Sequence, residues 1–183
     1  MNDLTGAVCR VLYLFVPAFV ANMAPVLVRG HFIAPAHPID GGRTSGGIRV
    51  FGDHKTWRGL VAGIVAGAAV YAKQRVLHEI EPFRGLASID YARWRLLPGI
   101  LMGLGAGAGD ALKSLVKRRI GIAPGESWIG FDQLDFFVGS YLAVAPIYSA
   151  PFVATIVATP VVFVGGILIS AAGYSLHLKE AWI

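Results

Sequence analysis

The sequence predicts an all-α, polytopic integral membrane protein with about five transmembrane helices and two functional loops on one aqueous side. Of its 183 residues, 55% are hydrophobic and only 15% are charged, and the mean hydropathy is +0.62. A soluble domain of this length needs a far more charged surface. The apolar residues also form blocks long enough to cross a bilayer, which takes roughly 20 helical residues.

The spans are expected to form a single transmembrane domain over residues 1–183, and its first span is expected to remain in the mature chain. Residues 1–6 carry no positive charge, and the apolar block after them is longer than a signal-peptide core. The predicted spans are 4–28, 59–79, 96–116, 135–159 and 160–178, with a short turn at 159–160 between the last two. The predicted functional loops are 29–58 and 117–134.

Glycines recur at every fourth position in two of the predicted spans. They are Gly59, Gly63 and Gly67 in the second span, and Gly99, Gly103 and Gly107 in the third. Such ladders of small residues let helix backbones approach closely in lipid. We therefore expect the two helices to pack together, and a substrate groove lined by backbone is the functional alternative.

The distribution of Lys and Arg predicts the orientation of the chain. Loop 29–58 holds five of them and loop 117–134 holds three, whereas the connection 73–95 on the opposite side holds five. The positive-inside rule therefore places the two functional loops and the C-terminus in the cytosol and the N-terminus outside. The net charge of +5 reflects this orientation, so no nucleic-acid partner is expected.

Asp110 lies inside the third apolar block, about two helical turns before the basic residues that end it. A carboxylate at membrane depth is expensive and generally faces a polar cavity. On a helix, Asp110, Lys113, Ser114 and Lys117 fall on one face, with the carboxylate deepest and the cations nearer the water. This arrangement favours a metal ion and a polyphosphate bound at the membrane surface.

Asp132 and Asp135 are three residues apart, so one helical turn places both carboxylates on the same face. Together with Asp110 they supply the oxygen ligands that Mg²⁺ prefers. The structural alternative is that Asp132 caps the fourth helix and Asp135 follows in its first turn. Asp110 just upstream, with basic residues between, favours the metal site.

A second cluster lies at the entry to the second span, in the segment 52–59. Lys55 and Arg58 are suited to bind phosphate, and Thr56 is suited to cap the helix that starts beside them. An interfacial anchor explains the cations and Trp57 without any chemistry, but it leaves Asp53 and His54 unexplained. The glycines of the preceding segment 38–47 have two equally good interpretations. The segment is either a loop that closes over a substrate or a loop that is simply flexible.

Other features of the sequence carry no catalytic motif. The histidines lack zinc-ligand spacing, and no phosphate-binding P-loop is present. A basic group on the opposite side is interpreted as a lipid-headgroup contact or interfacial anchor; its members are Arg84, Arg93 and Arg95.

The two clusters together resemble the CDP-diacylglycerol synthase superfamily. Residues 52–59 read GDHKTWRG, similar to the family's K-T-x-E-G segment, and 109–135 resemble its signature G-D…S…K-R…P-G…D-R-x-D. The archaeal branch, the CDP-archaeol synthases, is the closer match, through P-x-x-P-I-D-x-G at 35–42, G-D-x-K-T-W-x-G at 52–59 and D-Q-L-D at 132–135. Arg58, Gln133 and the pair Ile122-Ala123 depart from the broader family pattern.

This resemblance implies a Mg²⁺-dependent membrane cytidylyltransferase that transfers CMP from CTP to an isoprenoid ether glycerol phosphate, giving a CDP-archaeol-type lipid and pyrophosphate. The implied catalytic residues are Asp110, Asp132, Asp135 and Lys117, with the three aspartates holding the metal. The implied substrate-binding residues are Asp40, Asp53, His54, Lys55, Thr56, Arg58, Lys113, Ser114 and Arg118. The alternatives are a CDP-diacylglycerol synthase acting on phosphatidic acid and, in another class, a small ion-coupled transporter. The sequence leaves the oligomeric state open, and a homodimer is compatible with it.

Overall fold

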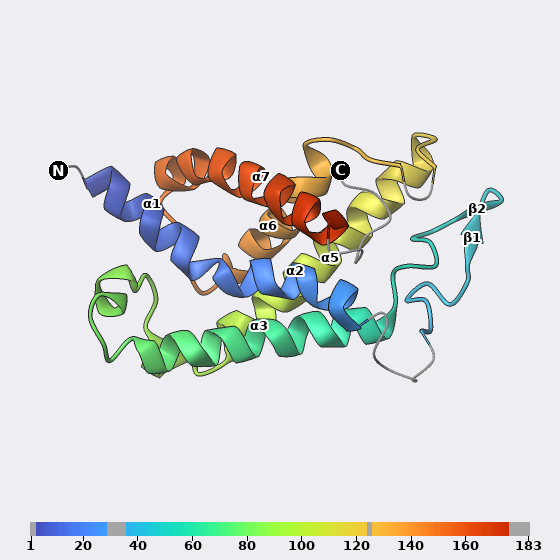
Figure 1. Cartoon of the computed structure of the whole chain (residues 1–183). Helices are drawn as coiled ribbons and strands as arrows, with labels where there is room; N and C mark the ends of the chain where they lie inside the picture. The colour runs from blue at the N-terminus through green and yellow to red at the C-terminus, as the bar shows by residue number, and fades with distance from the viewer. Residues whose placement is uncertain (1–2, 29–35, 124–125, 176–183) are drawn as a thin grey trace.

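The computed structural model of the chain describes residues 3–28, 36–123 and 126–175. Its elements in chain order are α1 (Asp3–Leu14), α2 (Val16–Val28), β1 (Thr44–Ser45), β2 (Ile48–Arg49), α3 (Trp57–Leu77), the 3₁₀ helix η1 (Phe83–Leu86), α4 (Tyr91–Trp94), α5 (Leu97–Arg119), α6 (Phe131–Val144) and α7 (Phe152–Ser175). The long helices lie side by side, with the β1–β2 hairpin at one end of the molecule and η1 and α4 at the other (Figure 1). The expected all-α architecture is confirmed. The predicted cytosolic C-terminus and the start of loop 29–58 lie outside the described residues.

The first predicted span is one apolar segment that is broken at Phe15 into α1 and α2. Pro17 has no N–H, so it cannot donate to the carbonyl of Tyr13 as a continuous helix requires. The Gln74 side chain of α3 donates to that carbonyl instead, over 2.5 Å. Gln74 is buried, and this hydrogen bond fixes the bend against α3.

Thr56 and the glycine ladders fix α3 as the sequence predicts. The hydroxyl of Thr56 accepts the backbone N–H of Gly59 at 3.2 Å, which caps the first turn. A Cβ added at Gly67 would lie 2.6 Å from the carbonyl oxygen of Gly99, so only glycine allows α3 and α5 to approach this closely. The expected packing role of the ladders is confirmed.

The apolar core lies where the bend between α1 and α2 meets α6. The ring of Phe15 meets that of Phe137 edge-on at 4.8 Å between centroids, and Phe19 meets Phe136 in the same way at 5.0 Å. The hydroxyl of buried Ser140 donates to the carbonyl of Met102 on α5. These contacts hold α6 against α2 and α5 and thereby orient its first turn.

The predicted boundary between the fourth and fifth spans is wrong. Helix α7 runs through Thr159 and Pro160, where the turn was expected, and the actual connection between α6 and α7 is residues 145–151. Pro151 directly precedes α7, and its carbonyl accepts the N–H of Thr155. Pro160 costs α7 one backbone hydrogen bond, a loss that membrane helices tolerate when neighbouring groups compensate.

Three helical segments of the described residues are long and apolar enough to cross a membrane: Leu4–Val28, Trp57–Leu77 and Phe152–Ser175. Helix α5 is equally long but carries Asp110, Lys113 and three basic residues in its last turn. Helix α6 has 14 residues and is therefore about 21 Å long, short of the roughly 30 Å hydrocarbon core. The two helices that carry most of the polar residues thus differ from the three strongly apolar segments around them.

Candidate active site

The carboxylates of the site come from the facing surfaces of α5 and α6. Asp110 lies two turns before the end of α5, and Asp132 and Asp135 lie in the first turns of α6. The two helices approach so closely that a Cβ added at Gly109 would overlap the carbonyl oxygen of Asp135, and one at Gly139 would overlap that of Gly105. This close approach brings the three carboxylates together.

Lys113 lies in the middle of these carboxylates. Its Nζ is 3.2 Å from Asp110 Oδ1, 3.0 Å from Asp132 Oδ1 and 2.6 Å from Asp135 Oδ2. The spacing of Lys113 and Asp110 on one face of α5 was predicted. That a single ammonium group contacts all three carboxylates was not, because the contacts to Asp132 and Asp135 join different helices. Lys113 therefore neutralises part of the charge that a bound cation would otherwise balance.

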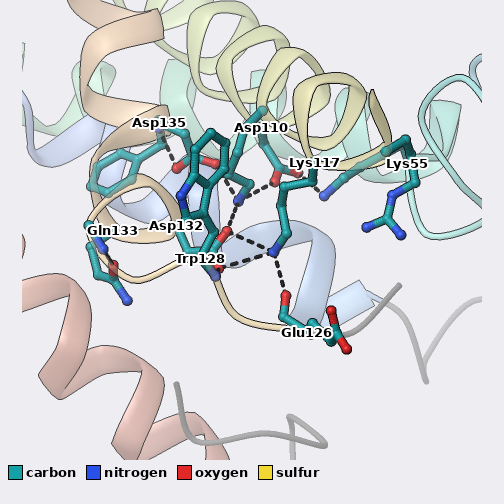
Figure 2. A network of polar contacts seen from close by, with 12 residues as sticks. Lys55, Asp110, Lys117, Glu126, Trp128, Asp132, Gln133 and Asp135 are labelled. Carbon is teal, nitrogen blue, oxygen red and sulfur yellow. Dashed lines mark hydrogen bonds and ion pairs between the residues drawn. The ribbon is translucent and has the colours of Figure 1, made fainter. Parts of the chain in front are cut away.

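Two further lysines flank this cluster (Figure 2). Lys55, in the loop before α3, forms an ion pair with Asp110 Oδ2 at 2.5 Å. Lys117, one turn beyond Lys113, lies 3.2 Å from Asp132 Oδ2. Three ammonium groups thus face three carboxylates, and each carboxylate contacts at least one ammonium group.

Lys117 also fixes the loop between α5 and α6. Its buried Nζ donates to the carbonyl of Glu126 at 2.5 Å (Figure 2), while the N–H of Trp128 donates to Asp132 Oδ2 at 2.6 Å. Arg118 similarly donates to the carbonyl of Ala123. Lys117, predicted to be catalytic, and Arg118, predicted to bind substrate, thus lie in the last turn of α5 and form contacts within the protein.

The loop before α3 is a folded unit organised by Asp40. Its buried carboxylate accepts the N–H groups of Gly42 and Phe51, both at 3.0 Å, and pairs with Arg49 at 2.9 Å. Burial opposes ionisation of this carboxyl, but the two N–H donors and Arg49 outweigh burial and lower the pKa of Asp40 to about 2. Arg49, which the sequence did not single out, also pairs with Asp53. Asp40 therefore holds the loop that carries Asp53 and Lys55.

One cavity of about 510 Å³ joins the two clusters, a volume typical of ligand pockets. Among the predicted residues, those that line it are Asp53, His54, Lys55, Thr56, Arg58, Asp110, Lys113, Asp132 and Asp135. The remaining predicted residues, Asp40, Ser114, Lys117 and Arg118, lie outside its lining. The cavity continues between α2, α3 and α5 along Pro25, Gly63, Gly103 and Gly107. It therefore has one strongly charged end and one apolar end inside the helix bundle.

Some residues that build the cavity were not predicted. Gly105, Gly109 and Gly139 set the distance between α5 and α6, and the spacing of four between Gly105 and Gly109 was the available signal. Gln133, where the broader family has arginine, is buried and accepts the N–H of Gly130 at 2.7 Å. This residue closes the first turn of α6, so its departure from the family pattern has a structural role.

The donors in the cluster are suited to a divalent cation. Three carboxylates converge from two helices, and carboxylate oxygen is the ligand type that Mg²⁺ prefers. Within the described residues, however, no group of three or more acidic, His or Cys side chains is arranged to hold a metal ion directly. The Lys113 ammonium lies between the carboxylates, so metal binding there requires Lys113 to move.

Comparison with known proteins points to one family. The family model described as CarS-like: CDP-archaeol synthase matches residues 4–183. The CDP-archaeol synthase of Pyrococcus furiosus is 32% identical over 145 residues, 79% of each chain. The Thermococcus onnurineus relative of the same name is 44% identical, over 72% of this chain and 71% of the relative. That of Halorubrum lacusprofundi is 34% identical, over 96% of this chain and 97% of the relative.

The fold also has a counterpart among solved structures. An intramembrane enzyme for archaeal membrane lipid biosynthesis superposes with a TM-score of 0.70 and 30% sequence identity. The match covers 86% of this chain and 90% of that enzyme. It therefore includes most of the helices that build the cavity.

Proposed function

Because the chain belongs to the CDP-archaeol synthase family, we propose that it transfers CMP from CTP to the phosphate of an isoprenoid ether glycerol phosphate. It is a membrane cytidylyltransferase of archaeal lipid biosynthesis. The observation that supports the proposed lipid phosphate substrate is the cavity with a charged end and an apolar end. A substrate with an anionic headgroup and an apolar chain matches this division.

The reaction needs positioning and charge neutralisation more than covalent catalysis. A phosphate oxygen of the lipid attacks the α-phosphorus of CTP, a new P–O bond forms, and the bond to the bridging oxygen breaks to release pyrophosphate. In our proposal Lys55, Arg58 and Lys113 bind the phosphates, because all three line the charged end of the cavity. Lys117 and Arg118 contribute by holding the loop between α5 and α6.

We propose that Asp110, Asp132 and Asp135 hold Mg²⁺ when nucleotide is bound. The support is the donor set: three carboxylates converge on one position, which the Lys113 ammonium now occupies. Arrival of the CTP phosphates would give Lys113 an alternative anionic partner and release the carboxylates. The metal would neutralise charge on the reacting phosphates.

We also propose that the charged end of the cavity faces the cytosol, with the N-terminus outside. The excess of Lys and Arg in loops 29–58 and 117–134 supports this orientation, and CTP is a cytosolic metabolite. The test uses Arg43→Cys and Arg84→Cys, each made in a chain whose native Cys9 is replaced by serine. Labelling of each cysteine by an impermeant maleimide is measured in sealed cells. Labelling of position 43 from outside would show that the protein has the opposite orientation.

The experiment that tests the function follows pyrophosphate release by purified protein in lipid nanodiscs. CTP and Mg²⁺ are supplied with either 2,3-bis-O-geranylgeranylglycerol 1-phosphate or phosphatidic acid. We expect release with the ether lipid phosphate and little with phosphatidic acid. Equal turnover of both acceptors would assign a CDP-diacylglycerol synthase, and release with neither acceptor under any divalent ion would contradict the enzyme assignment.

A further inference from the structure

Besides the 510 Å³ cavity, the molecule has a groove of about 480 Å³ whose lining includes none of the carboxylates of the site. Its lining residues are Arg75, Trp94, Arg95, Leu96, Leu97 and Ile100. They come from the last turn of α3, the end of α4 and the first turn of α5. These segments lie at the end of the molecule opposite the β1–β2 hairpin (Figure 1).

The position of the groove along the membrane normal follows from α3. Arg75 is eighteen residues after Trp57 on this helix, which corresponds to roughly 27 Å of helix rise. That distance nearly equals the thickness of the hydrocarbon core. Since Trp57 starts α3 beside the charged end of the catalytic cavity, Arg75 lies at the opposite membrane–water interface.

The groove combines cationic and apolar walls. Arg75 and Arg95 are exposed, and neither forms an ion pair with a carboxylate of the described residues. Asp90, the acidic residue nearest to Arg95 in sequence, instead caps α4 by accepting the N–H groups of Ala92 and Arg93. The cationic wall is therefore available to an external anion.

The backbone at the same place adds to this positive character. Leu96 precedes α5 and provides no side-chain cap. Leu96 and Leu97 line the groove, so the positive end of this 23-residue helix lies beside it. Trp94 provides an amphipathic ring of the kind that is enriched at membrane interfaces. Leu96, Leu97 and Ile100 continue the groove as an apolar wall.

We propose that this groove binds an anionic phospholipid of the leaflet opposite the catalytic carboxylates. Its phosphate lies between Arg75 and Arg95, and one of its chains follows Leu96, Leu97 and Ile100. The charges identify the headgroup as anionic, and the apolar wall identifies the ligand as a lipid. Such a lipid joins the end of α3 to the start of α5, which otherwise meet through the glycine ladder. The groove lies at the other end of the molecule from the carboxylates, so its binding of a lipid is independent of cytidylyltransferase activity.

The test measures phospholipid binding to the purified full-length protein in detergent, by native mass spectrometry and by thermal unfolding. The probes are dioleoylphosphatidylglycerol and, as a lipid without phosphate, dioleoylglycerol. We expect the first lipid to bind and to raise the unfolding temperature, and the second to do neither. The Arg75→Gln/Arg95→Gln variant should bind phosphatidylglycerol about tenfold to thirtyfold more weakly, because each basic residue near the membrane surface contributes to anionic-lipid binding.

Lys73→Gln is the matched control. Lys73 is exposed near the end of α3, two residues before Arg75, but does not line the groove. It should bind phosphatidylglycerol as the wild type does, and Arg75→Lys/Arg95→Lys should retain most of the binding. If the double glutamine variant does not purify, Arg75→Gln alone carries the test, since Arg75 is exposed at the end of its helix.

Several results would overturn the proposal. Unchanged phosphatidylglycerol binding in the glutamine variants would place the lipid elsewhere, including in the catalytic cavity. Equal binding of dioleoylglycerol would remove the role of the phosphate. A changed oligomeric state in the glutamine variants would identify the groove as a contact between copies of the chain.

Discussion

At the scale of single residues, the site is organised by charge balance. Lys55, Lys113 and Lys117 face Asp110, Asp132 and Asp135 at ion-pair distance. A partly buried charge is tolerated only when it is paired, and removing one partner leaves the other uncompensated. The cluster is therefore stable as a unit and sensitive to substitution of any member. In the proposed reaction, incoming phosphates and a metal ion would replace these internal pairs with external ones.

Lys113→Met should have opposite effects on the binding of a divalent ion and on the binding of CTP. Without the ammonium group, the carboxylates repel one another, so affinity for a divalent ion rises, by about tenfold or more on simple Coulomb grounds. Affinity for CTP falls, since one phosphate-binding cation is lost. Mn²⁺ binding followed by electron paramagnetic resonance and CTP binding followed by calorimetry measure the two effects.

The control for this prediction is Lys73→Met, which removes an exposed lysine at the other end of α3. It should leave both affinities unchanged. If Lys113→Met bound Mn²⁺ no better than the wild type, the carboxylates would not be the metal site.

Asp40 gives the loop before α3 a defined pH dependence. The folded loop lowers the pKa of Asp40 to about 2, from an ordinary value of 3.8. The ionised carboxylate of Asp40 therefore stabilises the loop fully above about pH 4. This stabilisation is lost as the pH falls to about 2. Hydrogen exchange of the Phe51 and Gly42 amides should be slow at pH 5 and faster at pH 2.5 than the intrinsic pH effect explains.

Substitutions isolate this effect. Asp40→Asn should lose the added protection at both pH values, whereas Asp53→Asn should keep it, because Asp53 contacts Arg49 and neither amide. Equal protection in wild type and Asp40→Asn at pH 5 would show that the carboxylate does not hold the loop.

Most residues of the site could be predicted from the sequence, whereas most of the contacts between them could not. Helical spacing is short-range and exact, so the common face of Asp110 and Lys113 could be predicted. The pairing of Lys55 with Asp110 joins positions far apart in the chain, and no spacing rule reports it. For Asp40, the motif identified the position, but only the folded loop reveals that its carboxylate points to Gly42 and Phe51.

At the scale of elements, the glycines between α5 and α6 determine the geometry of the site. A Cβ at Gly139 would overlap the Gly105 carbonyl oxygen and lie 3.0 Å from the Cα of Gly109. Both obstacles are backbone, so a side chain there forces the helices apart. The carboxylates of Asp110 and Asp135 would move apart with them.

Gly139→Ala should therefore lower both stability and turnover. Overpacking of this kind typically costs about 1–3 kcal/mol, and a displacement of about 1 Å in the site reduces turnover on the order of a hundredfold. Gly165→Ala is the control, because a Cβ there meets only a ring carbon of Phe19 at 3.9 Å. Thermal unfolding and pyrophosphate release should distinguish the two variants, and similar behaviour of both would contradict a specific role for the α5–α6 contact.

The helix boundaries show where prediction from the sequence fails. Caps and small-residue ladders depend on local chemistry, and Thr56 and Gly67 behave as predicted. Proline is ambiguous, because in lipid its missing hydrogen bond can be tolerated inside a helix. Pro160 was interpreted as a turn and lies within α7, whereas Pro17 accompanies a real break that depends on Gln74 of another helix.

At the scale of the whole molecule, polar groups concentrate at both ends of an apolar helix bundle. One end holds the carboxylates and lysines, and the other holds Arg75 and Arg95, with glycine-packed helices between. The 510 Å³ cavity extends from the charged end into the bundle. A lipid substrate can thus present its phosphate to soluble CTP while its chains remain in an apolar environment.

In our proposal, CMP is transferred to the lipid phosphate at the carboxylate cluster between α5 and α6. The most direct measurement follows the label of [α-³²P]CTP into the ether lipid phosphate in nanodiscs, for the wild type, Asp135→Asn and Asp90→Asn. Asp90 caps α4 at the far end of the molecule, so its variant controls for loss of a carboxylate. We predict that Asp135→Asn reduces label transfer at least about a hundredfold while Asp90→Asn transfers label at close to the wild-type rate. Label transfer at the wild-type rate by a folded Asp135→Asn protein would show that the reaction does not need this carboxylate cluster.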